Sequence, residues 1–257
     1  MEKKNLKQIC DKLLNTFLSA GKKSIELREK GLIKRIKSDN TPVTNGDEEV
    51  NKLLTKEIKK LTPDIPIVSE ESSENKSEIN LSKFWLIDPI DGTYDYINNK
   101  DEFTLNASLV INKIPELGII YAPAKDRLFY SYENTHSYEI NNKNTIRLNC
   151  EKKTKKNKIK AVSYSSDLKP IIKDLHNKFG VTEFIKMKSS LKFCVIASGE
   201  FDLYVAEPRA SEWDIAAGHA ILKNAGGIIT DFENNQIFYG KKGFKNPSLI
   251  LKRNNYL

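Results

Sequence analysis

The sequence predicts an α/β protein whose two halves differ in character. In residues 102–132, three β-branched and aromatic runs are separated by turns at 112–115 and 123–126, a pattern typical of consecutive antiparallel strands. After about residue 160, short strands alternate with helices, which is typical of α/β architecture. We therefore expect a mixed α+β half over residues 1–150 and an α/β half over residues 151–257, joined in one compact unit.

Composition indicates a globular protein of a reducing compartment. The 257 residues are 39% apolar and include 11 Phe and 10 Tyr, enough for a large core. Cys10, Cys150 and Cys194 are widely spaced and form neither a zinc pattern nor a disulfide framework. No window approaches the roughly eighteen apolar residues of a membrane span, and the N-terminus lacks the apolar core of a signal peptide. We expect a cytoplasmic protein without an integral membrane segment and leave open a peripheral contact with the inner membrane.

The formal charge of +8 raises the question of a nucleic-acid partner. The lysines are scattered, and only residues 151–160 form a dense run. Solvated loops explain such a run better than a polyanion-binding surface does, although that surface remains an alternative. A positive field would also attract a small anionic substrate, so we expect a small phosphate ester and no nucleic acid as partner.

The N-terminal third is predicted to hold two amphipathic helices. Residues 4–30 carry apolar side chains at helical spacing. Residues 37–47 are polar and rich in turn formers, which predicts a loop and not a strand. Asp47 is expected to cap the next helix, whose apolar face includes Val50, Leu54 and Ile58. Taken alone, Asp47 needs no other role than that cap.

Acidic residues follow two predicted strands. A short strand at 65–68 runs into Glu70 and Glu71, which alone could be a solvated turn. A buried strand at 84–87, which we expect Pro89 to stop, is followed by two carboxylates three residues apart, Asp88 and Asp91. Such a pair is costly at a buried strand end unless a cation lies between the two groups.

The residues after Asp91 complete a phosphate site in outline. Gly92 allows a sharp turn and a close approach of the backbone to a ligand. A helix beginning near Thr93 would direct free N–H groups toward the same place and suit an anion. Carboxylates that hold a cation beside amides that hold an anion indicate a metal-dependent phosphate site.

The second half is predicted to begin after a polar, lysine-rich boundary at residues 141–160. Strands are expected at 161–164, 184–187 and 201–205, with helices at 169–179 and 188–198. A helix rich in small residues covers 212–224, stops at 225–227, and is followed by two or three short strands.

Five acids lie where a predicted element begins or ends: Asp47, Glu70, Asp88, Asp91 and Asp214. Gathered in one cleft they would repel one another unless divalent ions neutralised them. Oxygen ligands without His or Cys nearby favour Mg²⁺ over zinc. Two such ions could clamp the attacking and leaving oxygens of a phosphate ester.

Four motifs carry a family resemblance: VTNGD at 43–47, SEES at 69–72, WLIDPIDGT at 85–93 and EWDIAAG at 212–218. In this order they resemble the Mg²⁺-dependent, lithium-sensitive phosphatase superfamily of inositol monophosphatase, over residues from about 5 to about 250. Within it, residues 101–110, 189–204 and 213–227 are most similar to the CysQ-type 3′(2′),5′-bisphosphate nucleotidases. The resemblance implies a layered αβαβα sandwich of the inositol monophosphatase and fructose-1,6-bisphosphatase type, with the site between the two halves.

The resemblance also implies a ligand set for two or three Mg²⁺ ions. Glu70, Asp88 and the backbone carbonyl of Ile90 would hold the first ion. Asp88, Asp91 and Asp214 would hold the second, with Asp88 bridging the two.

The catalytic groups implied by the resemblance are Asp47, Glu70 and Thr93. Thr93 would bond the attacking water, and Asp47 would take a proton through Thr93, without a phosphoenzyme. The amides of Gly92 and Thr93 would cradle the phosphate, next to Asp91 and Asp214 as further substrate contacts.

Specificity is implied by a second group of residues. Ser189, Ser190 and Lys192 match the nucleotidase pattern that holds a second phosphate, although the serines could instead cap the following helix. Ala206 stands where many relatives carry an arginine, and Arg209 is expected to reach the same phosphate from a shifted loop.

Two further expectations concern histidines. Ser166 stands where a histidine is common in relatives. His136, His176 and His219 are expected to be structural.

The function expected from the resemblance is hydrolysis of adenosine 3′,5′-bisphosphate to AMP and phosphate, with the sulfated form of that nucleotide as a second substrate. An inositol monophosphatase or a related sugar phosphatase is the nearest alternative. A non-catalytic, basic-surface binding module that retains only the fold is another, against which stand the five acids and Thr93. Monomer and homodimer are both left open.

Overall fold

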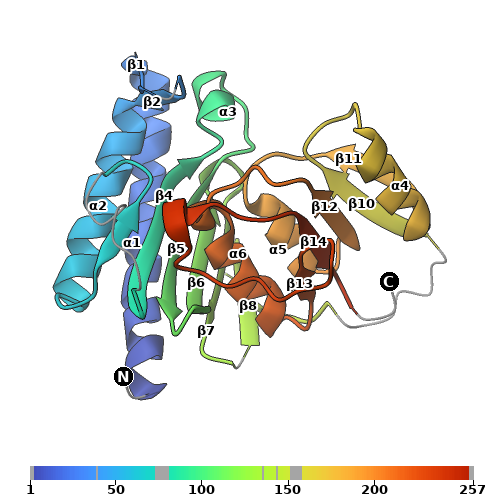
Figure 1. Cartoon of the computed structure of the whole chain (residues 1–257). Coiled ribbons are helices and arrows are strands. Elements are labelled where there is room, and N and C mark those ends of the chain that lie inside the picture. Colours follow the sequence, from blue (N-terminus) through green and yellow to red (C-terminus); the bar gives the residue numbers. More distant parts are fainter. Residues whose placement is uncertain are drawn as a thin grey trace.

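The chain folds into five layers that alternate between helices and sheets (Figure 1). A computed structural model describes residues 3–38, 40–72, 81–134, 136–142, 144–150 and 158–254. The helices α1 (Lys3–Lys30) and α2 (Asn45–Leu61) form the first layer and α4 (Pro170–Lys178) forms the last. Helices α5 (Leu191–Ala197) and α6 (Glu212–Asn224) lie between the two sheets. The expected αβαβα sandwich is therefore confirmed.

The larger sheet has seven strands in the order β3-β4-β5-β6-β7-β8-β9, all antiparallel except the β3–β4 pair. Its central strands are buried on both faces. In β4, Trp85 and Ile87 pack toward α1 and α2, whereas Phe84 and Leu86 pack toward α5 and α6. Burial on both faces explains why this strand reads as one continuous apolar run. The strands are β3 (Ile67–Ser69), β4 (Lys83–Asp91), β5 (Thr104–Ile111), β6 (Ile114–Ala122), β7 (Arg127–Tyr132), β8 (His136–Asn141) and β9 (Asn144–Leu148).

The smaller sheet has five strands in the order β11-β10-β12-β14-β13. Leu203 and Val205 of β12 face α4, while Tyr204 and Ala206 face the inner helices. This alternation seals both sides of the sheet. The strands are β10 (Ile159–Ser163), β11 (Val181–Lys186), β12 (Leu203–Ala206), β13 (Ile228–Thr230) and β14 (Leu249–Lys252).

Helix α6 lies unusually close to the larger sheet because small residues face each other there. A Cβ atom placed on Gly118 of β6 would lie 2.4 Å from the carbonyl oxygen of Ala217. On the helix itself, a Cβ on Gly218 would lie 2.3 Å from the ring of Phe193 in α5. The small residues that the sequence shows in this helix therefore serve close packing, and they fix the height of Asp214 over the sheet.

The structure corrects the expectation for residues 37–47. A short hairpin of β1 (Lys34–Ile36) and β2 (Pro42–Thr44) replaces the expected loop, and helix α2 starts at Asn45. Three-residue strands are too short to show an apolar period, which is why composition suggested a loop. Thr44, and not Asp47, is the N-cap of α2, and Asp47 is the third helical residue of a capping box.

Two further strand boundaries differ from expectation. Strand β4 does not stop at Pro89 but continues to Asp91, with one extra residue inserted opposite β5. Proline is tolerated at such a bulge because no ladder donor is needed from it. Strand β9 occupies part of the expected polar boundary; as an edge strand with four of its five residues exposed, it carries no burial pattern.

The lysine-rich run falls largely on residues 151–157, which lie outside the described residues. Within the described residues, no helix combines the length and the apolar character that crossing a membrane requires. Cys10, Cys150 and Cys194 are buried, and none of them forms a disulfide within the described residues. The division of the chain into two halves at residue 150 stays a prediction.

The close contact between β6 and α6 makes Gly118→Ala a test of how the fold places the site. We expect this variant to lose about 1–3 kcal/mol of unfolding free energy in urea, because the added methyl meets helix backbone and not a flexible side chain. Because the displaced helix carries Asp214, Mg²⁺ affinity measured by calorimetry should fall as well.

Gly180→Ala serves as the control, since that glycine has a left-handed φ of 66° but nothing within 4 Å of its added Cβ. It should lose stability through backbone strain alone and keep its Mg²⁺ affinity. Equal loss of Mg²⁺ affinity in both variants would contradict the role given to the contact.

Candidate active site

The end of strand β4 brings Asp88 and Asp91 to one place. In a regular strand, residues three apart point to opposite faces. Here Asp88 pairs with Asn106 and Asp91 with Thr104, so the ladder gains one residue on the β4 side. This bulge turns both carboxylates toward the same site, where the charge of Asp91 helps to raise the pKa of Asp88.

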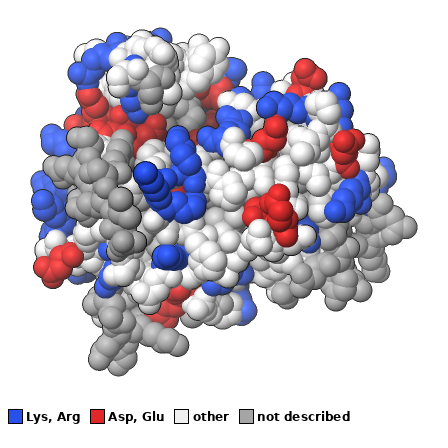
Figure 2. Space-filling model, viewed as in Figure 1, with Lys and Arg blue, Asp and Glu red and all other residues white. Residues whose placement is uncertain are grey.

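Three carboxylates from distant parts of the chain meet there. Oxygen atoms of Glu70, Asp88 and Asp214 lie within 4.8 Å of one another. Glu70 follows β3, Asp88 lies in β4, and Asp214 is in the first turn of α6, where it accepts a hydrogen bond from the Ser211 amide at 2.7 Å. On the face shown in Figure 2, acidic side chains gather below the β1–β2 end of the molecule, beside lysines and arginines.

The cluster carries more negative charge than its surroundings stabilise. Burial, together with the charges of Glu70, Asp91 and Asp214, raises the pKa of Asp88 well above its ordinary value. Burial and the charges of Asp91 and Glu70 raise the pKa of Asp214 to about 7. Asp88 is 1% exposed, and its Oδ1 atom has no hydrogen-bond partner among the described residues. Buried oxygen donors of this kind suit a hard divalent cation.

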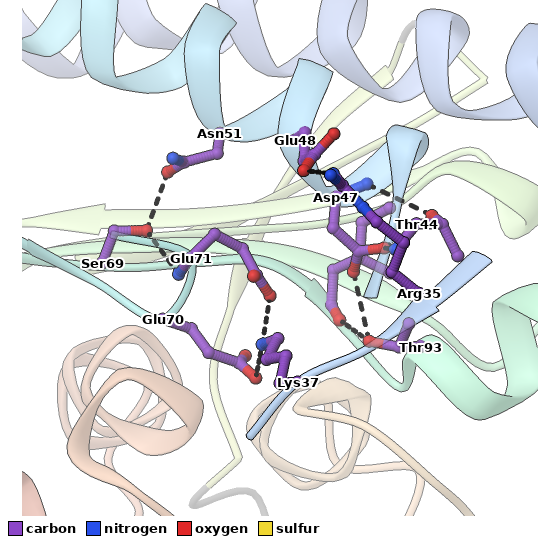
Figure 3. A network of polar contacts seen from close by, with 11 residues as sticks. Arg35, Lys37, Thr44, Asp47, Glu48, Asn51, Ser69, Glu70, Glu71 and Thr93 are labelled. Atoms are coloured by element: carbon purple, nitrogen blue, oxygen red, sulfur yellow. Dashed lines mark hydrogen bonds and ion pairs between the residues drawn. The ribbon is translucent and has the colours of Figure 1, made fainter. Parts of the chain in front are cut away.

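Lys37 is a cation of this site that the sequence analysis missed. Its ammonium lies 3.1 Å from Glu70 Oε1 and 2.6 Å from Glu71 Oε1 (Figure 3). Burial acts to lower the pKa of Lys37, but the charges and hydrogen bonds of the two glutamates outweigh burial and raise the pKa. The hairpin after α1 therefore extends a positive charge into the cluster, and Glu71 is not the solvated turn residue it could have been.

Asp47 and Thr93 form a hydrogen-bonded pair beside the cluster (Figure 3). Asp47 Oδ2 accepts hydrogen bonds from the amide and the hydroxyl of Thr44, at 2.8 and 2.6 Å. Its other oxygen lies 3.2 Å from the Thr93 hydroxyl, which is also 3.1 Å from the carbonyl of Ile90. Burial raises the pKa of Asp47, although the hydrogen bonds from Thr44 and Thr93 act against that rise.

Gly92 connects the bulge to the short helix α3 (Thr93–Ile97) in a left-handed conformation with φ 97°. A Cβ here would also lie 2.9 Å from the carbonyl oxygen of Glu102. Both the turn and the close approach therefore require glycine, and the expected helix after this turn is present.

Ser190 does not cap helix α5 with its side chain, although it occupies the N-cap position. Its hydroxyl lies 2.6 Å from Asp91 Oδ2 and 2.6 Å from the carbonyl of Asp214, and it accepts a hydrogen bond from Asn106 at 3.0 Å. The cap alternative is wrong for this serine. Asn106, which the sequence analysis also missed, lies in strand β5 and links that strand to Ser190 at the start of helix α5.

A cavity of about 110 Å³ opens beside the acidic cluster. Lys192 lies at its wall, 7% exposed, with its ammonium bonded to the carbonyl of Ser189. Burial lowers the pKa of Lys192 to about 8, partly opposed by the charge of Asp91. The lining of the cavity combines acidic, cationic and aromatic side chains: Asp91, Tyr164, Ser189, Ser190, Lys192, Phe193, Tyr204, Ala206, Arg209, Ala210, Asp214, Ile215 and Leu249.

The structure thus places the expected metal and catalytic residues around one centre and the expected specificity residues around an adjoining cavity. Ser166 is exposed and does not line that cavity. Of the histidines expected to be structural, His219 is buried against Tyr239, with its Nδ1 3.0 Å from the phenol oxygen. Burial lowers the pKa of His219 to about 3, which keeps it neutral.

Comparison with known proteins decides the family. A model of the inositol monophosphatase family matches residues 4–255. The chain belongs to the inositol monophosphatase family. This family is metal-dependent, as the acidic cluster leads one to expect.

Two bacterial relatives share the name 3′(2′),5′-bisphosphate nucleotidase CysQ. The protein of Buchnera aphidicola is 35% identical over 245 residues, which cover 91% of this chain and 88% of the relative. That of Aggregatibacter actinomycetemcomitans is 34% identical and covers 84% and 82%. The resemblance to CysQ-type proteins is confirmed.

Solved structures agree with this assignment. CysQ from Bacteroides thetaiotaomicron, described as a bacterial member of the inositol monophosphatase family, is 29% identical with a TM-score of 0.74 and covers 93% of this chain and 94% of its own. An IMPase/NADP phosphatase, complexed with Mg²⁺ and phosphate, shares the fold at 18% identity and a TM-score of 0.78, covering 96% and 91%.

The raised pKa values give a prediction for the effect of Mg²⁺ on stability. The pKa of Asp214 is about 7 in the folded chain against an ordinary value of 3.8, so stability without a cation should fall as pH rises through that interval. A divalent cation bound to the cluster removes this cost. The gain in unfolding free energy on adding Mg²⁺, measured by calorimetry, should therefore be several times larger at pH 8 than at pH 5, approaching about 2.7 kcal/mol at a hundredfold excess over Kd.

Asp214→Asn should reduce both the gain at pH 8 and its pH dependence. A variant outside the site, Asp126→Asn in the turn before β7, should retain both. Equal gains at pH 5 and pH 8 in the unmodified protein would show that these carboxylates do not hold the ion.

Proposed function

We propose that this protein is a Mg²⁺-dependent phosphomonoesterase that hydrolyses adenosine 3′,5′-bisphosphate to AMP and phosphate. The observation that carries the proposal is the position of a partly buried acidic cluster directly beside a cavity lined by cations, with Asp214 common to both. A substrate with two phosphates fits that division of charge. The name of the relatives that are 34–35% identical, bisphosphate nucleotidase, supports the same substrate class.

The donor set fits Mg²⁺, because it consists of oxygen atoms of which one, Asp88 Oδ1, is buried without a partner among the described residues. Glu70, Asp88 and the carbonyl of Ile90 would hold one ion, and Asp88, Asp91 and Asp214 a second, with a third ion left open. When bound, Mg²⁺ supplies a Lewis acid that neutralises phosphate charge and lowers the pKa of water.

Thr93 and Asp47 would handle the proton of the attacking water. The Thr93 hydroxyl donates toward Asp47 Oδ1, so its lone pairs remain to accept a hydrogen from water. Asp47 is 1% exposed and held by Thr44, which fixes its orientation, and burial brings its pKa closer to neutrality. The amides of Gly92 and Thr93 would bind the phosphate group that is hydrolysed.

Ser189, Lys192 and Arg209 would bind the second phosphate of the substrate. Lys192 supplies a buried positive charge. Arg209, which also lines the cavity, supplies a planar pair of hydrogen-bond donors. Ser190 would position Asp91 through its hydrogen bond; a direct contact with substrate stays a prediction.

The sulfated nucleotide, whose 3′-phosphate is the same, is proposed as a second substrate. We also propose a cytoplasmic location, which is supported by three cysteines that form no disulfide within the described residues. Monomer or homodimer stays a prediction.

The test of the proposed substrate is phosphate release in Mg²⁺ from adenosine 3′,5′-bisphosphate and from inositol 1-phosphate at matched concentrations. We expect the nucleotide to be preferred about a hundredfold or more in kcat/KM, equivalent to about 2.7 kcal/mol of transition-state stabilisation. Equal or better hydrolysis of inositol phosphate would leave a phosphatase but reject the nucleotide as its substrate.

Thr93→Val tests the proton-handling pair. The variant keeps the shape of the side chain and removes the hydroxyl, so kcat should fall about a hundredfold or more. Mg²⁺ affinity by calorimetry should stay within about twofold, because no carboxylate is lost. Thr55→Val, on the far part of α2 with its hydroxyl bonded to the carbonyl of Asn51, is the matched control and should keep full activity. A Thr93→Val enzyme of normal kcat would remove Thr93 and Asp47 from the mechanism.

A further inference from the structure

Three cations lie around one cavity without a close ion pair to a carboxylate of the described residues, although the charge of Asp91 acts on Lys192. Lys192 and Arg209 line the cavity, and Lys188 contacts the ring of Tyr164, which lines it too. Within the described residues, none of the three forms an ion pair with an Asp or a Glu. Lys37, Arg127 and Lys241, in contrast, each form such a pair. Positive charges left unpaired around a partly desolvated space are costly, and an anion that enters the space removes that cost.

Tyr164 holds two of these cations. The guanidinium carbon of Arg209 lies 3.2 Å from the centre of the Tyr164 ring, and the ammonium of Lys188 lies 3.4 Å from it. The hydrogen bond from Lys188, the hydrogen bond from Arg209 and the charges of both groups lower the pKa of Tyr164, although burial acts against this shift. Tyr164 follows β10, Lys188 follows β11 and Arg209 follows β12, so the contact joins three loops at the carboxyl ends of these parallel strands.

We propose that Tyr164 and Lys188 are specificity-determining residues: with Arg209 they form an anion clamp that binds the second phosphate group of the substrate. This inference rests on the function proposed above and extends it to residues without a role there. The ring of Tyr164 keeps two long, flexible cations at the cavity before substrate arrives, which reduces the side-chain entropy lost on binding. Lys188 and Arg209 thereby supply charge at a wall where Ala206 offers none.

The members of the clamp lie closer to solvent than Lys192 does. Arg209 is exposed, Tyr164 is 38% exposed and Lys188 is partly buried, whereas Lys192 is 7% exposed. A phosphate between them would contact a fixed ammonium on the buried side and two cations on the solvent side. Charge on both sides favours a dianionic phosphate monoester over a neutral hydroxyl group at this position.

Binding of AMP tests the clamp without hydrolysis, because AMP carries the second phosphate and lacks the one that is removed. Calorimetry in the presence of Mg²⁺ should show AMP affinity at least tenfold weaker for Lys188→Gln than for the unmodified protein. Lys186→Gln removes the same charge two residues away, from an exposed side chain of β11 outside the cavity lining, and should stay within twofold.

Two variants of Tyr164 separate the ring from its hydroxyl. Tyr164→Phe keeps the ring and should bind AMP within about threefold of the unmodified protein. Tyr164→Leu removes the ring and should weaken AMP binding about fivefold or more, because Lys188 and Arg209 are then no longer held at the cavity. Full AMP affinity in Tyr164→Leu would remove Tyr164 from the clamp.

Hydrolysis provides the second readout. The ratio of kcat/KM for adenosine 3′,5′-bisphosphate to that for adenosine 3′-monophosphate should fall at least tenfold in Lys188→Gln, with the monophosphate value within twofold. If bisphosphate is hydrolysed but Lys188→Gln and Arg209→Gln bind AMP normally, the clamp is wrong and the proposed reaction stands. If neither nucleotide is hydrolysed but AMP binds and the variants weaken it, the reaction is wrong and the clamp stands. Failure of the unmodified protein to bind AMP would overturn the clamp.

Discussion

The rest of this structure depends on one electrostatic constraint: several carboxylates are buried together at the end of strand β4. Burial and mutual repulsion raise the pKa values of Asp88, Asp91 and Asp214 together. The fold nevertheless holds these groups in place, through a bulge in β4, a helix N-terminus at Asp214 and the hydroxyl of Ser190. Proteins keep such a destabilising group of charges where it serves a function. Oxygen donors in this number suit a divalent cation.

The architecture shows how that cost is supported. The strand that carries Asp88 is buried on both faces, so its end cannot move without disturbing two cores. Helix α6 is fixed against the same sheet by the contact of Gly118 with Ala217, so a second strand, β6, also helps to position Asp214. Strand β4 and helix α6, which lie far apart in the sequence, thus meet at the site. The hairpin that carries Lys37 adds a positive charge from a third direction.

Local patterns in the sequence predicted most helices and strands and the five acids, through apolar runs, turn residues and acids at element ends, whereas the layered arrangement and the role of Thr93 came from the family resemblance. Sequence reasoning failed where a contact joins positions far apart in the sequence. Lys37 reads as one lysine among many until β1 and β2 bring it to Glu70 and Glu71. Asp47 was expected as a cap and proved to be the third residue of a capping box, because a serine, threonine or acid at either position gives the same signal.

The sequence analysis also missed the edge strand β9 and the contact of Tyr164 with Lys188. A mostly exposed strand and a contact near the surface leave no apolar period in the sequence.

The cavity beside the acidic cluster shows how a positive charge can be supplied from a different position in the sequence. The family resemblance leads us to expect an arginine at the strand position that Ala206 occupies, and a side chain on a strand is held by its neighbours. Arg209 comes instead from an exposed loop, where a free arginine would lose about 2 kcal/mol of rotamer entropy on binding. Contact with the ring of Tyr164 restricts the arginine before a ligand arrives, so that part of this entropy is already lost in the folded protein. A move from strand to loop can therefore preserve the charge at the cavity when an aromatic ring takes over the positioning that the strand provided.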